Sequence, residues 1–532
     1  MTATPLPAKL SLTGRVVTMS DSFAVIPRGT IYIDDGAIVA VQAAEQPAPI
    51  DFAGSPAIET GGTIYPGLME LHNHLSYNAL QLWPVPQKYG DRSQWLGTPP
   101  YQQLVTQPMK VLGTAPGLTP AVVRYVECKC LLAGVTTSQG IALFSNTGIS
   151  RYYQGTVRVA ESPNDSSLPA AGSKIPDVIA TDRTAFLNEL GSRKCFLLHL
   201  SEGVDDAARA HFQTLQFPDG TWAITDSLAG IHCAALKSPD FEVMVSHGAS
   251  MVWSPLSNLL LYGATADVSA ARAAGVRISI GPDWTPSGSK SLLGELKVAQ
   301  IYAQETAIGW SDRDLVSMAT RDAAAILQWD HLLGTIEAGK RADLIVVGGT
   351  QDDPYKALLA ATEASITLVM IDGVARVGTP DLMLKLGMPG ESIVVGRQKR
   401  TLNLGQPTQD PAVASLTLTQ ATQRLRDALK RLPELAKSVA VAAPITPEQA
   451  ASSEPRWYLA LDELGATGMA LRPELTPQTA PSLAAAGPAP QLPIQPLKLD
   501  PLTVVDDSDF LDRLGLEKNL PAFLVPSLRE IY

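Results

Sequence analysis

The chain has 532 residues, of which 45% are hydrophobic, so it can bury at least one large core and is too long for a single ordinary domain. Its 52 acidic and 41 basic residues give a net charge of -11, and Lys and Arg do not cluster with aromatic residues, which argues against a nucleic-acid partner. Four cysteines in so long a chain give no disulfide framework. The N-terminus lacks a basic region followed by an apolar core, and no apolar run reaches the roughly 18 residues of a membrane span. We therefore expect a soluble, cytoplasmic protein without a membrane partner.

The first segment, residues 1–62, is expected to form one part of a small β domain. The predicted strands are Leu10–Met19, Thr30–Ile33 and Ala37–Val41, and Asp34-Asp35-Gly36 between the last two is a hairpin signal. The same pattern of strands and turns returns in residues 335–400, where Asp372-Gly373 marks a turn. Two such segments on either side of a long insertion are most simply the two parts of one β-sandwich.

Between these segments, residues 63–334 alternate strands with helices, which predicts a parallel α/β sheet or barrel. The expected strands are Val135–Gln139, Thr156–Ala160, Cys195–Leu200, Gly230–Ala234, Ser250–Trp253 and Val276–Gly281. The fourth strand of the series is the least defined, because residues 161–182 resemble a loop, and its candidate is Asp177–Ala180. An alternation of about 270 residues fits one (β/α)8 barrel, whose chemistry lies at the C-terminal ends of its strands.

The motif His72-Asn73-His74 follows an apolar run that ends at Leu71. On a strand, alternate side chains point to the same face, so the two imidazoles would lie side by side and provide half of a metal site. For this short motif alone, two structural histidines at a strand end are an equally good interpretation.

Four further polar residues follow or end predicted barrel strands: His199, Glu202, His232 and Asp283. His199 ends an apolar run, Glu202 lies three residues later, His232 lies in Gly-Ile-His-Cys, and Asp283 closes the run from 277. Each of them alone is more often structural. Together with the His-x-His pair they provide the ligands of a catalytic metal ion with an open position for water.

The order His-x-His, His-x-x-Glu, His and Asp resembles the amidohydrolase superfamily, in particular its mononuclear branch of cytosine deaminase, guanine deaminase and the s-triazine chlorohydrolases. Ser254-Pro255-Leu256-Ser257-Asn258 resembles the Pro-x-Ser-Asn element of that branch, and residues 318–344 resemble its return into the β-sandwich. The resemblance implies an α/β TIM barrel with a composite β-sandwich over roughly residues 8–400. It leaves residues 401–532 as a C-terminal extension, which we expect to wrap the surface or to mediate contact in a homo-oligomer.

The resemblance implies that His72, His74, His199 and Asp283 hold one divalent ion, with Zn²⁺ preferred and Fe²⁺ as the alternative. It makes Glu202 a proton shuttle. His232 would hold the metal-bound water or ligate weakly. A single ion is favoured because no lysine is placed to bridge two: Lys174 is in a Gly/Ser turn and Lys194 is too near His199.

The implied reaction is hydrolysis of a non-peptide C–N bond in a small molecule, as in a deaminase. A metal-bound hydroxide would attack a carbon of a nitrogen heterocycle, while His232 and Asp283 hold the hydroxide and take its proton. Dechlorination and cyclic-amide hydrolysis use the same attack and remain alternatives.

Three residues are candidates for substrate contact. Trp83 lies in an aromatic-rich loop, residues 77–109, that would overhang the barrel, and Trp284 adjoins Asp283. Arg158 is on a predicted strand. The alternatives are packing within the loop for Trp83 and an ordinary salt bridge for Arg158.

A different class of enzyme is indicated by Ser287-Gly288-Ser289-Lys290, which fits the Ser-x-x-Lys pattern of serine acyl-transfer enzymes. No companion Ser-Asp-Asn or Lys-Thr-Gly occurs in the sequence. This alternative therefore ranks well below a metal-dependent hydrolase.

Overall fold

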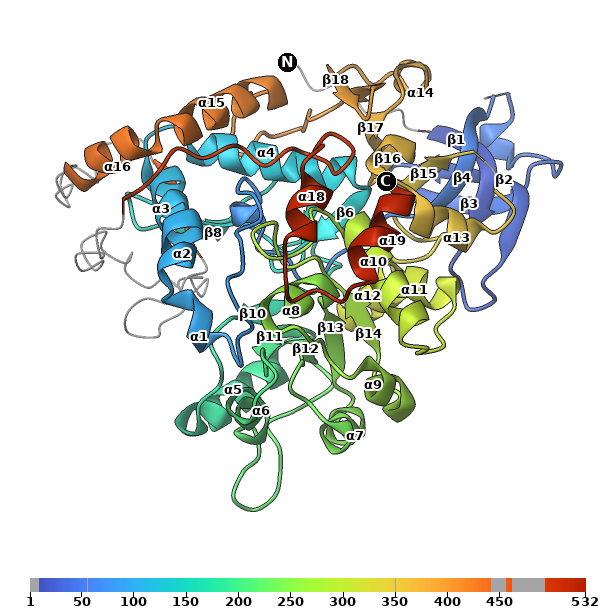
Figure 1. Ribbon diagram of the computed structural model, residues 1–532. Coiled ribbons are helices and arrows are strands. Elements are labelled where there is room, and N and C mark those ends of the chain that lie inside the picture. Colours follow the sequence, from blue (N-terminus) through green and yellow to red (C-terminus); the bar gives the residue numbers. More distant parts are fainter. Residues whose placement is uncertain (1–8, 55, 350, 442–455, 462–492) are drawn as a thin grey trace.

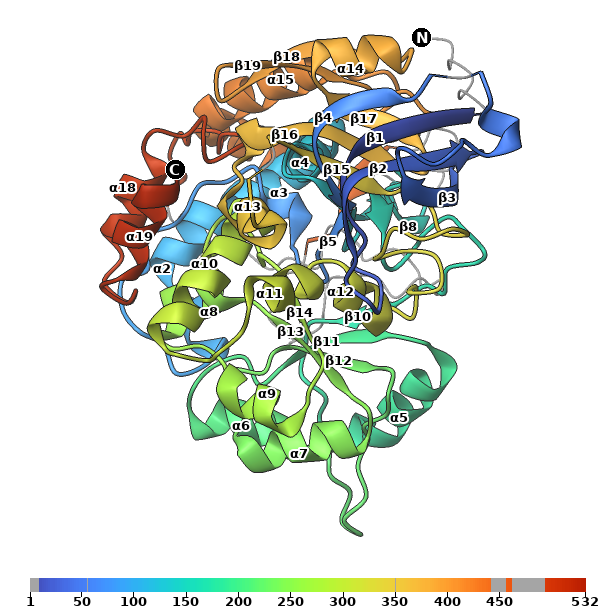
Figure 2. The same cartoon turned by 90° about the vertical axis from the view of Figure 1, so that its right-hand side faces the viewer.

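The computed structural model describes residues 9–54, 56–349, 351–441, 456–461 and 493–532 (Figure 1). Strands from both ends of the predicted insertion lie together on one side, and the remaining strands and most helices lie beside and below them (Figure 2). Among the helices of these residues, none is long and apolar enough to cross a membrane.

A nine-stranded sheet joins the two flanking segments in the order β18-β19-β17-β16-β15-β4-β1-β2-β3. Its strands are β1 (Lys9–Val17), β2 (Val25–Asp34), β3 (Ala37–Ala43), β4 (Ile58–Pro66), β15 (Leu344–Gly348), β16 (Ile366–Ile371), β17 (Val374–Gly378), β18 (Glu391–Val395) and β19 (Gln398–Leu402). The segments meet where β15 pairs antiparallel with β4. Both predicted turns form at positive φ, with 46° at Asp35 and 49° at Asp372, as a two-residue hairpin turn requires.

Eight further strands pair in parallel within two sheets, ordered β5-β6-β9 and β10-β11-β12-β13-β14. They are β5 (Leu68–Met69), β6 (Val135–Ser138), β9 (Arg158–Val159), β10 (Gly172–Lys174), β11 (Phe196–Leu200), β12 (Leu228–His232), β13 (Ser250–Trp253) and β14 (Ile278–Ile280). The sheets contact each other at both edges: Ala171 N donates to Ala160 O (2.9 Å), and a parallel bridge joins Asn73 to Asp283.

Helices connect these strands. They are α4 (Thr119–Leu132), α5 (Arg183–Ser192), α6 (Asp206–Gln213), α7 (Ser238–Ser246), α8 (Pro255–Tyr262), α9 (Val268–Ala274), α10 (Leu292–Glu305), α11 (Asp312–Met318) and α12 (Arg321–Ile326). Between β5 and α4 lie the short helices α1 (Ser93–Leu96), α2 (Pro99–Tyr101) and α3 (Gln107–Thr114), while α13 (Pro354–Ala360) and α14 (Pro380–Lys385) accompany the large sheet.

The fourth strand of the parallel series is β10, not the predicted Asp177–Ala180. Gly172 and Lys174 pair in register with Phe196 and Leu198 of β11. A Cβ at Gly172 would lie 2.5 Å from the Phe196 ring, so a glycine lets the two strands approach. Because Gly-Ser-Lys has little intrinsic strand preference, the pairing with β11 and not the local sequence defines this strand.

The described part of the C-terminal extension packs on the rest of the chain. The predicted helix over 416–441 is two helices, α15 (Leu418–Lys430) and α16 (Leu432–Val441), because Pro433 disfavours a continuous helix at this point. β20 (Trp457–Leu459) joins β7 (Ala142–Ser145) and β8 (Ser150–Tyr152) in a small sheet. Residues 493–532 carry α18 (Phe510–Gly515) and α19 (Leu524–Ile531), and the Pro/Ala-rich residues 473–492 lie outside the described residues.

Candidate functional site

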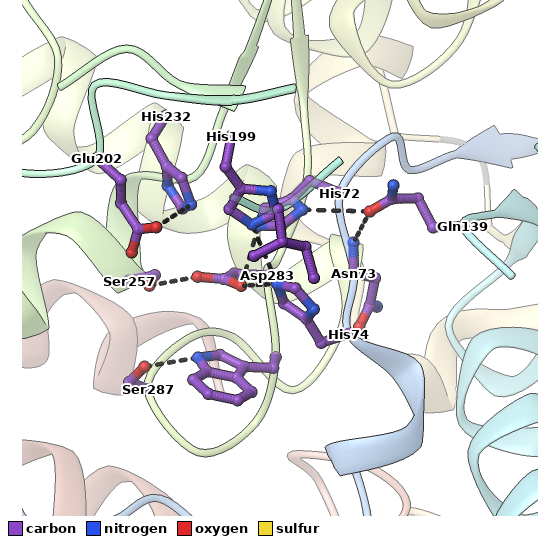
Figure 3. Close-up of polar contacts among 12 residues, drawn as sticks. His72, Asn73, His74, Gln139, His199, Glu202, His232, Ser257, Asp283 and Ser287 are labelled. Carbon is purple, nitrogen blue, oxygen red and sulfur yellow. Dashed lines mark hydrogen bonds and ion pairs between the residues drawn. The ribbon is translucent and has the colours of Figure 1, made fainter. Parts of the chain in front are cut away.

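Three imidazoles and one carboxylate converge beyond the ends of β5, β11 and β14 (Figure 3). His72 Nε2 lies 3.0 Å and His74 Nε2 lies 3.5 Å from the same oxygen, Asp283 Oδ1. His74 Nε2 also lies 3.2 Å from His199 Nε2. All four side chains are buried, so the residues predicted as ligands lie around one point inside the protein.

Gln139 determines which nitrogen of His72 carries the proton. The Gln139 amide oxygen accepts a hydrogen bond from Asn73 N (3.1 Å) and lies 3.2 Å from His72 Nδ1. Glu161 accepts from the amide nitrogen of Gln139 (3.2 Å) and so holds the amide in this orientation. Since an amide oxygen can only accept, Nδ1 must be the protonated nitrogen, and Nε2 presents its lone pair to the cluster.

The donor set fits a divalent cation. His72 Nε2 and His199 Nδ1 have no hydrogen-bond partner among the described residues. Burial and the neighbouring histidines hold the pKa of His199 well below its ordinary value, so its ring is neutral. Two imidazole lone pairs 3.2 Å apart repel each other unless a proton or a cation lies between them. Three imidazoles and one carboxylate are ligands that Zn²⁺ accepts.

Asp283 is held as an anion. Burial alone would raise its pKa, but His72 and the other imidazoles bring the pKa below its ordinary value. Ser257 Oγ donates to Asp283 Oδ2 (2.6 Å), which leaves the other oxygen for the histidines. Ser257 belongs to the Pro-x-Ser-Asn element, so this serine orients a member of the cluster.

His232 is held with its proton on the opposite nitrogen. Trp253 Nε1 donates to Thr265 Oγ1 (2.7 Å), and the Thr265 hydroxyl donates to Asn258 Oδ1 (3.3 Å). The Asn258 amide nitrogen then faces His232 Nδ1 at 3.2 Å, so Nδ1 accepts and Nε2 carries the proton. That N–H lies 3.7 Å from Glu202 Oε2. The ring is thus arranged as a hydrogen-bond donor, in contrast to His72.

Both His232 and Asp283 adopt a left-handed backbone, with φ of 66° and 65°. Residues other than glycine rarely adopt this conformation, which costs of order 1 kcal/mol or more and occurs often at functional sites. The turn at each strand end brings the side chain toward the cluster.

Glu202 is a buried carboxyl group next to the cluster. Burial raises its pKa to about 7, although Arg92 opposes the shift. Tyr262 OH donates to Oε1 (2.8 Å), and Arg92 Nη1 donates to Oε2 (3.3 Å). A carboxyl group that titrates near neutral pH can both donate and accept a proton during a reaction cycle.

Aromatic side chains enclose the pocket above the cluster. The segment of residues 75–101, which we call the roof, contributes Tyr77, Trp95 and Tyr101, and Trp284 completes the wall. The Trp284 ring centroid lies 5.1 Å from Tyr77 and 5.4 Å from His74. The space for water in this partly open pocket is about 30 Å³, room for roughly two water molecules.

Of the predicted substrate contacts, only Trp284 lines the pocket. Trp83 is buried behind Tyr101, with 5.6 Å between the ring centroids. Arg158 lies elsewhere, because its guanidinium pairs with Asp343 (3.2 Å) and Asp372 (2.8 Å), so the salt-bridge interpretation is the correct one.

Several site residues were not predicted: Arg92, Gln139, Asn258 as a partner of His232, and Tyr262. Arg92 and Tyr262 follow no strand end, so only their tertiary contacts reveal them. Gln139 directly follows β6, at the end of a predicted barrel strand, and could have been found from that position, although no apolar run marks it as one marks His199.

The Ser-x-x-Lys alternative does not fit the structure. Trp284 Nε1 donates to Ser287 Oγ (2.6 Å). The Lys290 ammonium pairs with Asp500 and, at 2.8 Å, with Asp507. A lysine held by two carboxylates cannot serve as the base for Ser287, so the serine enzyme interpretation is wrong.

Comparison with known proteins gives consistent matches. Residues 199–376 match the amidohydrolase family. The 5-methylthioadenosine/S-adenosylhomocysteine deaminase of Symbiobacterium thermophilum is 24% identical over 410 residues, which cover 68% of this chain and 91% of the relative. The S-triazine hydrolase of Gordonia rubripertincta is 27% identical over 202 residues, 37% of this chain and 40% of the relative.

Solved structures share the fold. The zinc complex of atrazine chlorohydrolase from Arthrobacter aurescens TC1 superposes with a TM-score of 0.54 at 20% identity, covering 69% of this chain and 94% of that one. Guanine deaminase from Bradyrhizobium japonicum gives a TM-score of 0.52 at 16% identity, covering 69% and 99%.

Proposed function

We propose that this chain, whose residues 199–376 match the amidohydrolase family, is a metal-dependent aminohydrolase that releases ammonia from a small planar nitrogen heterocycle. The observation that carries the proposal is Glu202, a buried carboxyl group with a pKa of about 7, set beside a histidine–aspartate cluster under aromatic walls. The relatives named as deaminases support the same class of reaction.

We infer that the two parallel sheets form one (β/α)8 barrel. Side chains from strands of both sheets, including Met69, Leu197, Ile231 and Val252, belong to one buried apolar cluster. This cluster would fill the barrel interior below the site, as in other barrels of this type. The ligands would then lie at the C-terminal strand ends, where barrel enzymes carry their chemistry.

The proposed cofactor is one Zn²⁺ ion held by His72, His74, His199 and Asp283. When bound, the ion supplies Lewis-acid activation of water at neutral pH. A single ion is supported by the residues around it. The prediction that Lys174 lies in a turn is wrong, because Lys174 ends the strand β10, but Ile175 and not Lys174 lines the pocket. A lysine that bridges a second ion is therefore absent from the described pocket lining.

The proton transfers fall to three side chains. Asp283, kept ionised, accepts a proton from the attacking water, and the His232 N–H holds the water oxygen. Glu202 delivers its proton to the ring nitrogen of the substrate, regains one from the hydroxyl at the attacked carbon and delivers that proton to the leaving amine. The proton held by Asp283 then returns to Glu202, so that both carboxyl groups are restored. Tyr262 and Arg92 each hold one oxygen of Glu202 and so keep the carboxyl group at the pocket wall.

The test replaces Glu202 by Gln, which keeps its size but cannot shuttle a proton, with Glu189→Gln on the surface of α5 as the matched control. The assay follows ammonia release from aminopurines, aminopyrimidines and amino-s-triazines, together with zinc content. We expect E202Q to keep zinc and to lose about 10²–10⁴-fold in turnover. Wild-type turnover in E202Q would remove Glu202 from the mechanism, and chloride release or ring opening without ammonia would favour the chlorohydrolase or cyclic-amide alternative.

A further inference from the structure

The C-terminal residues 493–532 lie against the roof of the pocket, although they lie far beyond the family match at 199–376. In Figure 1 this segment crosses α4, and α19 then packs beside α10. The roof gives the pocket Arg92, Trp95 and Tyr101, so any contact that fixes the roof also shapes the site.

The first attachment is a buried ionic centre at Asp500, whose side chain is 1% exposed. Asp500 Oδ2 accepts from Lys129 Nζ at 2.6 Å, and Oδ1 accepts from Lys290 Nζ. Lys129 Nζ also donates to Asn78 O (2.9 Å), and Asp500 N donates to Ala79 O (3.0 Å). The same centre therefore holds the C-terminal segment and the start of the roof.

The second attachment lies farther along both segments. Asn519 Nδ2 donates to Gln87 O (3.1 Å) and to Leu260 O of α8 (2.7 Å). Glu517 Oε2 accepts from Val85 N (3.2 Å). The roof is an irregular loop here, so its backbone groups at Val85 and Gln87 need partners outside a β-sheet. Side chains of the C-terminal segment supply these partners.

We propose that residues 493–532 form a clamp that positions the roof, with Asp500 and Asn519 as its positioning residues. The two attachments hold the roof on its outer side, just before it supplies Arg92 to Glu202 and the aromatic rings to the pocket. The roof forms one wall of the pocket, so the clamp sets how readily this wall moves when substrate enters.

The first test uses trypsin on the full chain, because Lys88 is an exposed site within the roof. Asp500→Asn and Asn519→Ala should each raise the rate of cleavage after Lys88 by about tenfold, through loss of hydrogen bonds that hold the loop closed. The matched control is Asp512→Asn, which loses only the surface pair with Arg529 (2.6 Å) and should leave the rate unchanged.

Cleavage after exposed Lys237, which directly precedes α7, separates local opening from general loosening of the fold. Selective cleavage at Lys88 supports the clamp. Equal acceleration at both sites, or a wild-type rate at Lys88 in a folded Asn519→Ala protein with normal zinc, overturns it. Asn519→Ala removes only two hydrogen bonds, so the test stands even if Asp500→Asn fails to fold.

The catalytic consequence of the clamp rests on the proposed function. Asn519→Ala should change KM by several-fold and also lower kcat, because the roof borders the pocket and carries Arg92, which holds Glu202. Failure of the proposed function would appear as no ammonia release by the wild-type protein. The cleavage result would still decide on the clamp.

Discussion

At the scale of single residues, two of the histidines in the site are prepared for opposite roles by their neighbours. Gln139 forces the His72 proton onto Nδ1, whereas Asn258 forces the His232 proton onto Nε2. A ligand needs a free lone pair, and a group that holds water needs a donor. These amides therefore distinguish residues of the same type within one cluster.

Replacing Asn258 by Asp should reverse the tautomer of His232. A carboxylate accepts from Nδ1–H, so Nε2 loses its proton and can no longer donate toward Glu202. We expect kcat/KM to fall about 10–100-fold while zinc content is retained. Thr265→Val, which removes only the bond that orients the amide, should have a smaller effect. Unchanged kcat/KM in N258D would show that the tautomer does not matter.

Replacing Gln139 by Met should weaken metal binding. Met is similar in size but cannot accept the proton of His72 Nδ1, so the ring loses both its orientation and its fixed tautomer. Zinc affinity, measured by chelator competition, should fall about 10–100-fold. If Q139M binds zinc as tightly as the wild-type protein, the ring is held by packing alone.

At the scale of elements, the roof contributes to the chemistry as well as covering it. Arg92 directly precedes α1 and donates to Glu202, which lies in the loop after β11. It also donates to Asp177 (3.0 Å) and to Ile175 O (2.8 Å). Arg92 N also donates to Glu202 O (3.3 Å). The roof therefore helps to hold Glu202, the proposed proton shuttle, in place.

Arg92→Met should lower kcat by roughly 10²-fold without loss of zinc, and Arg92→Lys should recover part of it. Arg92 lowers the pKa of Glu202, which burial holds at about 7, so its removal raises that pKa further. Because the protonated acid is the active form, activity should persist to higher pH in R92M. A pH–rate profile checks the direction, and an alkaline limb that moves to lower pH would contradict the assignment.

Sequence and structure agree where a polar residue ends an apolar run. His72, His74, His199 and Asp283 stand out in the sequence for this reason, and the structure brings them together. β10 was missed because its three residues form a strand only through pairing with β11, and Arg92 because its partners lie far away in the chain. The domain limits at 62, 334 and 400 and the oligomeric state stay predictions.

At the scale of the whole molecule, the proposed metal ion would link parts of the chain that are far apart in sequence. His72 and His74 follow β5, His199 lies on β11 and Asp283 follows β14. One ion would therefore cross-link positions between residues 72 and 283 of the chain. Without a cation, the imidazole nitrogens and the Asp283 carboxylate are crowded together with no positive charge between them. The ion should therefore stabilise the fold as well as activate water.

We expect about one zinc ion per chain by elemental analysis and a lower unfolding temperature after chelation. At free zinc of 100 to 1,000 times Kd, binding to the folded state alone stabilises by about 3–4 kcal/mol. His74→Ala should lose the ion and match the chelated wild-type protein, because its site is already incomplete. Since E202Q keeps all four ligands, its unfolding temperature should respond to chelation as the wild type does. Two tightly held ions per chain, or an unfolding temperature that chelation does not change, would contradict a single structural and catalytic metal ion.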